Sequence, residues 1–148
     1  MKSSLRKQQK GAVAIEFALV FVIFFAVFYG LVAYSLPLLL MQSFNKATAE
    51  AVRRAVAVDP ATSDYPTALQ NQANAVLTQQ LAWIPEQFAL KVGVDTSSVY
   101  DTTSSTLTVT VAYPSAKLSQ VFPLLVLPGI GTVPSLPTTL SATSSLQF

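Results

Sequence analysis

The sequence predicts an α+β fold, in which one long N-terminal helix spans a membrane and leads into a small head built on an antiparallel β-sheet. Three observations predict this fold. Of the 148 residues, 51% are apolar and only 11% are charged, about half the charged fraction of an average soluble domain. A long apolar run without charge lies near the N-terminus. Beyond residue 88, the apolar spacing changes from a helical period of about 3.6 residues to a strand period of about 2.

The first ten residues carry a concentrated positive charge. Lys2, Arg6, Lys7 and Lys10 lie there without any acidic residue, whereas from residue 12 onward seven acidic residues outnumber five basic ones. Basic residues within about 15 residues of a membrane span stay on the cytoplasmic side, so these orientation charges predict an N-in, C-out topology. Because the positive charge is confined to this segment and no aromatic residue is interleaved with it, the sequence argues against nucleic-acid binding.

Residues 12–41 are predicted to form the membrane-spanning helix. Residues 17–34 contain no charged residue, and a helix over residues 17–40 is about 36 Å long against a hydrocarbon core of about 30 Å. A cleaved secretory signal peptide is the first alternative, but its apolar region is about 7–15 residues long and ends in small residues. A buried helix of a soluble protein is a weaker alternative, because nothing else in the chain would cover it on all sides.

Glu16 lies one helical turn inside this apolar run. A carboxylate inside a membrane segment is costly and by default marks a functional site. The plain structural alternative is that its side chain reaches the cytoplasmic interface or pairs with Lys10. The sequence alone leaves both interpretations open.

The residues around Glu16 form a motif. The run Lys-Gly-Ala-Val-Ala-Ile-Glu-Phe over residues 10–17 stands where the basic leader meets the apolar segment. It resembles the processing site of type IV prepilins, most closely that of the Flp and TadE-like branch of tight-adherence (Tad) pili. The resemblance implies that a prepilin peptidase cuts between Gly11 and Ala12, that Glu16 becomes the fifth residue of the mature chain, and that Phe17 is the aromatic residue that typically follows it.

Such a cut would remove the basic leader, residues 1–11, and create an α-ammonium group at Ala12. Ala12 and Glu16 are four residues apart and therefore neighbours on a helix surface. An isolated carboxylate is expensive in hydrocarbon, whereas one paired with a cation is tolerable. In a bundle of helices, the carboxylate of one subunit would pair with the ammonium of its neighbour. The resemblance implies this assembly role for Glu16.

Two helical segments are predicted in the head, residues 42–148. The first helix is expected to continue beyond the membrane and to end by Val58, because an Asp-Pro pair follows. Glu50 and Arg54 have the spacing of a favourable ion pair along this helix. A second helix is predicted over residues 65–82, where apolar residues recur every three to four positions after potential capping residues.

Three strands are predicted after these helices. Apolar residues alternate over 88–95 and 106–113, and the Ser/Thr/Asp-rich segment 96–105 between them predicts an antiparallel hairpin. The alternation over 138–148 predicts a third strand. The apolar segment 117–131, broken by prolines and glycines, is expected to cover the sheet. The alternative is an exposed apolar patch for a partner or for the outer bilayer surface.

The composition lacks residue types that most catalytic and metal-binding sites use. The chain has no Cys and no His, which excludes thiol nucleophiles, disulfides, Cys/His zinc sites and His-based triads. Asp95 and Asp101 flank the predicted connection but lack the ligand ladder of a calcium loop, so we expect them to form turns. Only an active site built from acidic residues such as Glu50 or Glu86 is left as an alternative. We predict no enzymatic activity, no cofactor and no metal.

The resemblance implies the function of a minor pilin or pseudopilin that helps to assemble a Tad (Flp-type IVb) pilus and thereby supports adhesion and biofilm formation. The head is larger than that of a major Flp pilin, which favours the minor role. The implied partners are the prepilin peptidase, the major Flp-type pilin, other minor pilins, the assembly platform of the bacterial inner membrane, and the lipid bilayer. The sequence is compatible both with permanent residence of the protein in that membrane and with its entry into the fibre. The rival function is a single-pass anchor that displays a binding or adhesive domain.

Overall fold

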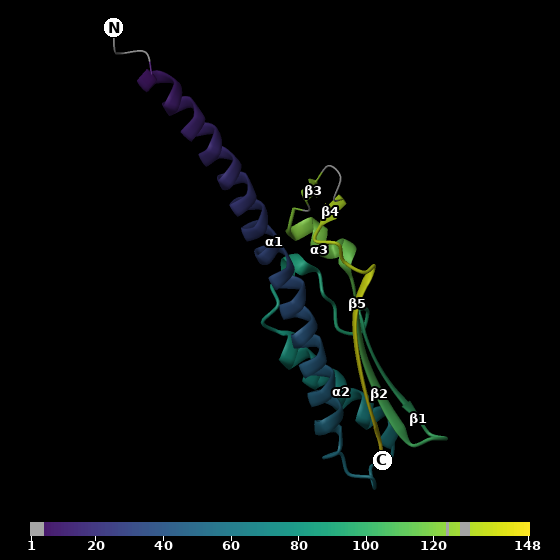
Figure 1. Ribbon diagram of the computed structural model, residues 1–148. Helices are drawn as coiled ribbons and strands as arrows, with labels where there is room; N and C mark the ends of the chain where they lie inside the picture. Colours follow the sequence, from purple (N-terminus) through teal and green to yellow (C-terminus); the bar gives the residue numbers. More distant parts are fainter. Residues whose placement is uncertain (1–4, 124, 128–130) are drawn as a thin grey trace. The chain divides into compact units, whose positions relative to one another are not determined.

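The computed structural model describes residues 5–123, 125–127 and 131–148, and for residues 5–10 and 127 it describes the backbone alone. The chain forms two compact units, Met1–Leu36 and Pro37–Phe148. The helices and strands of Figure 1 are, in chain order, α1 (Leu5–Ala55), α2 (Tyr65–Leu81), the 3₁₀ helix η1 (Glu86–Phe88), β1 (Thr96–Asp101), β2 (Thr106–Pro114), α3 (Ser115–Val121), β3 (Leu125–Leu127), β4 (Gly131–Val133) and β5 (Thr139–Gln147).

The first unit consists of the N-terminal part of α1. All residues from 11 to 28 are exposed, although most are apolar. A helix that is apolar on all sides suits a membrane or the core of a large protein. Within the described residues, α1 is the one helix that is long and apolar enough to cross a bilayer.

The remainder of α1, from Pro37, belongs to the second unit and packs on the sheet. Phe44, Ala51 and Ala55 recur at helical spacing and are completely buried. Thr48 is also buried, and its hydroxyl shares a 2.9 Å hydrogen bond with the Ser144 hydroxyl of β5. This face of the helix meets the sheet through the Phe44 ring, whose centroid lies 6.0 Å from that of Tyr113 in β2.

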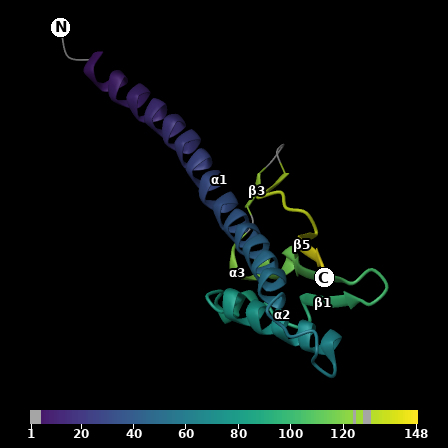
Figure 2. The same cartoon turned by 90° about the horizontal axis from the view of Figure 1, so that it is seen from below.

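α2 confirms the second predicted helix. It begins after Asp64, whose carboxylate accepts the Thr67 N–H at 3.4 Å, as expected of a capping residue. It lies beside the C-terminal end of α1, where Arg54 Nη1 donates to Gln79 Oε1 at 3.4 Å (Figure 2). The end of α1 at Ala55 confirms the predicted stop before Val58. The buried residues of α2 are Leu69, Ala73, Val76, Leu77 and Leu81.

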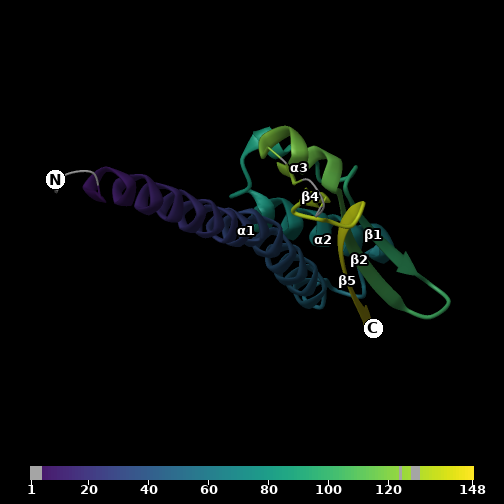
Figure 3. The same ribbon diagram turned by 45° about the horizontal axis from the view of Figure 1, so that its top comes forward.

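β2 is the central strand of a three-stranded antiparallel sheet with the order β1-β2-β5 (Figure 3). Val111 of β2 lies opposite Thr96 of β1 and Ala142 of β5. Alternate residues of β2 are buried, namely Leu107, Val109, Val111 and Tyr113. The predicted strands over 106–113 and 138–148 are therefore confirmed, and together with the apolar helix they give the predicted α+β, pilin-like architecture.

The predicted strand over 88–95 is wrong. That segment begins with Phe88, the last residue of η1, and continues as a turn, in which Ala89 and Gly93 adopt positive φ angles of 50° and 90°. Positive φ is incompatible with an extended strand. The strand that pairs with β2 is β1, which lies inside the segment predicted to connect two strands. Its connection to β2 is shorter than predicted, because only residues 102–105 lie between the two strands.

The alternation over 88–95 was misleading because burial does not follow it. Phe88 is buried, whereas Val94 is 76% exposed. The Asp95 carboxylate accepts the Lys91 N–H at 2.8 Å and closes the turn that replaces the predicted strand.

The expectation that segment 117–131 covers the sheet is also wrong for most of its described apolar side chains. Leu118 of α3 is buried, but Val121 is 36% exposed, Leu125 39% and Val126 72%. β3 and β4 pair with each other and form a separate two-stranded sheet. Their short hairpin therefore leaves apolar surface uncovered.

Tyr113 joins several parts of the core. Its hydroxyl donates a 2.8 Å hydrogen bond to the Phe88 carbonyl oxygen, and its ring centroid lies 6.0 Å from that of Phe44. Burial of the phenol, with a smaller contribution from the negative charge of Asp95, raises the pKa of Tyr113 to about 12. The phenol is therefore neutral and acts as a hydrogen-bond donor at neutral pH.

Replacing Tyr113 with phenylalanine is expected to lower the free energy of unfolding by about 1 kcal/mol at pH 7, because one buried hydrogen bond is lost. The pKa of Tyr113 rises from 10.0 to about 12 on folding, so its contribution is complete below pH 10 and is lost as the pH rises toward 12. Urea unfolding of the detergent-solubilised chain at pH 7 and 11 measures both effects. Equal stability of the two proteins at pH 7 would contradict the role of this hydrogen bond.

Candidate processing and assembly site

Gly11 and Ala12 lie next to each other in α1 and are both exposed. A side chain added at Gly11 would meet no other atom within 4 Å. Glycine in a helix interior is about 1 kcal/mol less favourable than alanine. The described packing gives no reason for glycine at this position.

Glu16 is an exposed residue of the same helix, four positions after Ala12. The sequence has no basic residue between residues 11 and 45, and no ion pair of Glu16 occurs among the described side chains. The carboxylate is thus surrounded by apolar residues of its own helix. A carboxylate enters hydrocarbon at low cost only when it is paired with a cation. For Glu16, that cation has to come from the leader, from a new chain terminus or from another molecule.

Phe17 begins a ladder of aromatic rings along α1. Its ring centroid lies 6.1 Å from that of Phe21, which in turn lies 6.3 Å from that of Phe25. The rings follow the four-residue spacing that places side chains above one another on a helix. An apolar face therefore starts directly beside the carboxylate.

The four orientation charges are only partly within the described structure. Lys2 lies outside the described residues. Arg6, Lys7 and Lys10 belong to α1 by their backbone. The predicted cleavage residues and assembly residues, in contrast, all lie on the exposed first unit.

The predicted Glu50–Arg54 pair is confirmed at the other end of α1. Glu50 Oε1 lies 2.6 Å from Arg54 Nε, and Glu50 Oε2 lies 2.7 Å from Arg53 Nε. Hydrogen bonds from Arg53 and Arg54 lower the pKa of Glu50 to about 2. This carboxylate is ionised at neutral pH and held by two guanidinium groups, so it is unsuited to general acid–base catalysis.

Asp95 and Lys117 form an ion pair that the sequence analysis missed. Lys117 Nζ lies 2.6 Å from Asp95 Oδ1 and 2.7 Å from Oδ2, and it also donates to the Ala89 carbonyl oxygen at 3.0 Å. The Asp95 side chain is 5% exposed. Because the two residues are 22 positions apart, no local spacing rule would have found them.

Asp101 has the turn role that the sequence predicts. Its carboxylate accepts the Thr103 N–H at 2.8 Å and the Ser104 hydroxyl at 2.7 Å. These two hydrogen bonds, that from Ser104 foremost, lower the pKa of Asp101. In the described part of the chain, no group of three His, Cys, Asp or Glu residues is placed to hold a metal ion.

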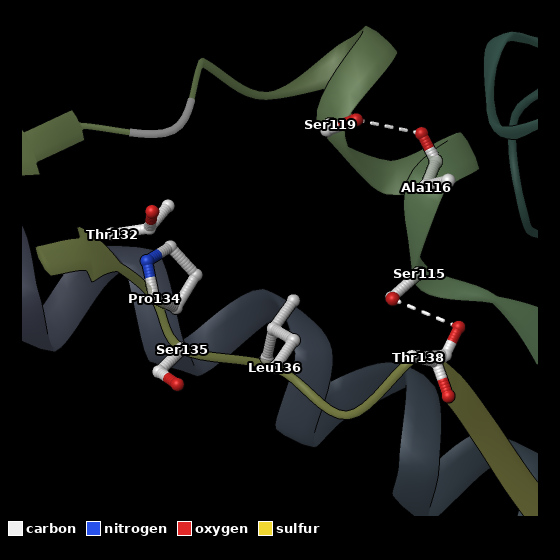
Figure 4. A pocket seen from close by; sticks show the side chains of 8 residues that line it. All are labelled: Ser115, Ala116, Ser119, Thr132, Pro134, Ser135, Leu136 and Thr138. Carbon is white, nitrogen blue, oxygen red and sulfur yellow. Dashed lines mark hydrogen bonds between the residues drawn. The ribbon is translucent and has the colours of Figure 1, made fainter.

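A shallow pocket of about 370 Å³ lies beside α3 and the segment that leads into β5 (Figure 4). The Ser115 hydroxyl donates to the Thr138 carbonyl oxygen at 3.0 Å, and the Ser119 hydroxyl donates to the Ala116 carbonyl oxygen at 2.7 Å. No charged residue is among the residues that line it, so it lacks a nucleophile–base pair. The lining residues are Ser115, Ala116, Ser119, Thr132, Pro134, Ser135, Leu136 and Thr138.

Comparison with known proteins identifies the segment that carries the candidate site. The model of the TadE-like protein family matches residues 11–53. No curated protein and no solved structure matches the chain significantly. The family comprises pilus components and is not a family of enzymes. Over residues 11–53, which include Gly11, Ala12, Glu16 and Phe17, the chain is therefore similar to TadE-like proteins, in agreement with the resemblance of its sequence.

Proposed function

We propose that this TadE-like protein is a minor pilin or pseudopilin that helps to assemble a Tad pilus. A role associated with the Tad pilus follows from the family match over residues 11–53. The finer assignment rests on the head, residues 42–148, which has an α+β core of its own. Such a head suits a subunit that primes or caps a fibre and contributes to adhesion and biofilm formation.

In this proposal, residues 12–41 span the bacterial inner membrane, with the N-terminus in the cytoplasm and the head outside. The positive charge of the first ten residues supports this orientation. The length and apolar character of α1 support the span. The prepilin peptidase removes residues 1–11 on the cytoplasmic side.

The single observation that carries the proposal is Glu16 in an otherwise apolar helix segment. Cleavage after Gly11 removes every basic residue before Lys46 and leaves the ammonium group of Ala12 as the one cation of this segment. Ala12 and Glu16 then lie on the same side of the helix. The ammonium of a neighbouring subunit pairs with Glu16 during assembly, because an unpaired carboxylate is unfavourable in hydrocarbon.

The partners follow from this chemistry. The peptidase recognises the Gly11–Ala12 bond, and the major Flp-type pilin and other minor pilins supply the neighbouring helices. The assembly platform of the inner membrane receives the processed chain. All of these partners act in or at the bilayer that holds α1.

Replacing Gly11 with valine is expected to leave the leader attached. The scissile bond lies inside α1, and a peptidase needs an extended chain. Glycine weakens the helix at this bond, whereas a β-branched side chain both restricts the backbone and crowds the cleavage position. Intact-mass analysis of the protein from a Tad-piliated bacterium measures the outcome.

The matched control is Gly30→Val, because Gly30 also lies in α1 and a side chain added there would meet no other atom within 4 Å. This variant is expected to be processed normally. Normal removal of the leader from the Gly11→Val protein would contradict the proposed processing site.

A further inference from the structure

An apolar surface is exposed on the segment that follows α3. We call Val121 at the end of α3, together with Leu125 and Val126 of β3, the hairpin patch; their exposed fractions are 36%, 39% and 72%. Because neighbouring residues of a strand point to opposite faces, Leu125 and Val126 expose apolar side chains on both faces of the hairpin. The sequence contains no charged residue after Lys117. From residue 118 onward, the chain therefore combines these exposed aliphatic side chains with a complete absence of charged residues.

α1 enters the second unit at one of its ends. The hairpin of β3 and β4 lies at this same end (Figures 1 and 2). Pro37 is the first residue of the unit. Leu38 and Leu39 follow it on α1 and are 60% and 48% exposed. Two exposed aliphatic surfaces, one on α1 and one on the hairpin, thus occupy the same end of the unit.

Charge is concentrated toward the other end of α1. Glu50, Arg53 and Arg54 lie in its last two turns, and Asp59 and Asp64 lie in the connection to α2. At the end where α1 enters, Lys117 of α3 is paired with the buried Asp95 carboxylate, and Glu86 lies in η1, which packs against α3. The exposed aliphatic side chains therefore gather at this end, whereas the cluster of charged side chains lies where α1 stops. A protein that stands on a bilayer has this distribution, because the charged end is in water and the apolar end faces lipid.

We propose that the hairpin patch inserts into the outer leaflet of the bilayer beside the membrane helix. This inference rests on the proposed topology, in which residues 12–41 span the membrane and the head lies outside. The apolar end of the head then meets the lipid surface. Within the hairpin, β3 and β4 pair from Leu125–Val133 to Leu127–Gly131. Their two outer edges find hydrogen-bond partners in the water and headgroups of the bilayer interface, so the hairpin patch lies at the depth of this interface. Through this second contact the bilayer limits the tilt of the head before the subunit joins a fibre.

The absence of cysteine in the chain allows a direct test by single-site labelling of the full-length protein in phosphatidylcholine/phosphatidylglycerol vesicles. An environment-sensitive fluorophore is attached to V126C, and its quenching by doxyl-labelled lipids is compared with its quenching by aqueous iodide. The matched control is V99C, since Val99 is an aliphatic residue of β1 that is 57% exposed. F24C reports on the membrane span itself.

We expect the label at V126C to lose much of its emission to doxyl lipids and little to iodide, and the label at V99C to show the reverse. Quenching of V126C by iodide alone, with F24C quenched by lipid, overturns the inference and leaves the proposed span intact. Protection of V126C from both quenchers overturns it in favour of a protein contact. If F24C is also quenched by iodide, both the inference and the proposed topology fail.

Discussion

Replacing Glu16 with alanine is expected to abolish incorporation of the protein into assembling pili and to leave its membrane insertion and leader cleavage intact. The Glu16 carboxylate does not favour membrane insertion, because a charged residue in a membrane helix makes the free energy of insertion about 3 kcal/mol less favourable. Its proposed benefit appears only when a neighbouring Ala12 ammonium needs a partner. Removal of Glu16 therefore leaves that ammonium unpaired in hydrocarbon, which is costly.

Crosslinking of the protein to other pilus subunits, together with counts of pili in a strain that depends on it, measures this effect. Glu16→Asp should restore part of the function, whereas Glu16→Gln should not, because charge rather than polarity is required. Ile15→Ala is the matched control, since Ile15 is a neighbouring residue that is 66% exposed. Normal piliation in the Glu16→Ala strain would support the rival function, a single-pass anchor with a binding or adhesive head.

The second large effect concerns the stability of the head. Replacing Lys117 with methionine is expected to lower the free energy of unfolding by about 3 kcal/mol, because it leaves the Asp95 carboxylate buried without its cation. Lys117 Nζ lies 2.6 Å from that carboxylate, whose side chain is 5% exposed. Denaturant unfolding of the detergent-solubilised chain measures the loss.

A second substitution separates charge from packing. In the Lys117→Met background, Asp95→Asn removes the unpaired charge and keeps an acceptor for the Lys91 N–H, so it should restore much of the lost stability. The exposed pair of Arg53 and Glu50 provides the control, because Arg53→Ala should change the free energy of unfolding far less than Lys117→Met does. A double variant that is less stable than Lys117→Met alone would contradict this account.

Local patterns were sufficient to predict much of the fold. The apolar run predicted α1, the capping residue and the apolar spacing predicted α2, and strict alternation predicted β2 and β5. In α2 and β2 the residues that recur or alternate are also the residues that are buried. In β5 this holds for Leu140 and Ala142, whereas Leu146 is 38% exposed. The local sequence pattern thus predicted which of these residues are buried, Leu146 excepted.

Features that depend on distant contacts were not predicted. β1 is rich in serine and threonine and forms because it pairs with β2 from Thr96–Val111 to Asp101–Thr106. The more regular alternation before it belongs to a turn that Asp95 closes. The ion pair of Asp95 with Lys117 joins segments 22 residues apart, and no sequence spacing indicates such a contact.

The candidate site differs from the head in this respect. Gly11, Ala12, Glu16 and Phe17 are close together in the sequence, so their relation on a helix was predictable from spacing. Their proposed chemistry depends on other molecules, the peptidase and neighbouring subunits. The family match places them in a TadE-like segment, while the cut itself and the pairing of Glu16 remain predictions.

The mass of the mature polypeptide, isolated from a bacterium that assembles Tad pili and sequenced from its first residue, is the most direct measurement. A chain that begins at Ala12 is the result we predict, since only this start places a new amino group one helical turn from Glu16. A chain that still carries Lys7 or Gln8, or one that begins near residue 36, would contradict it.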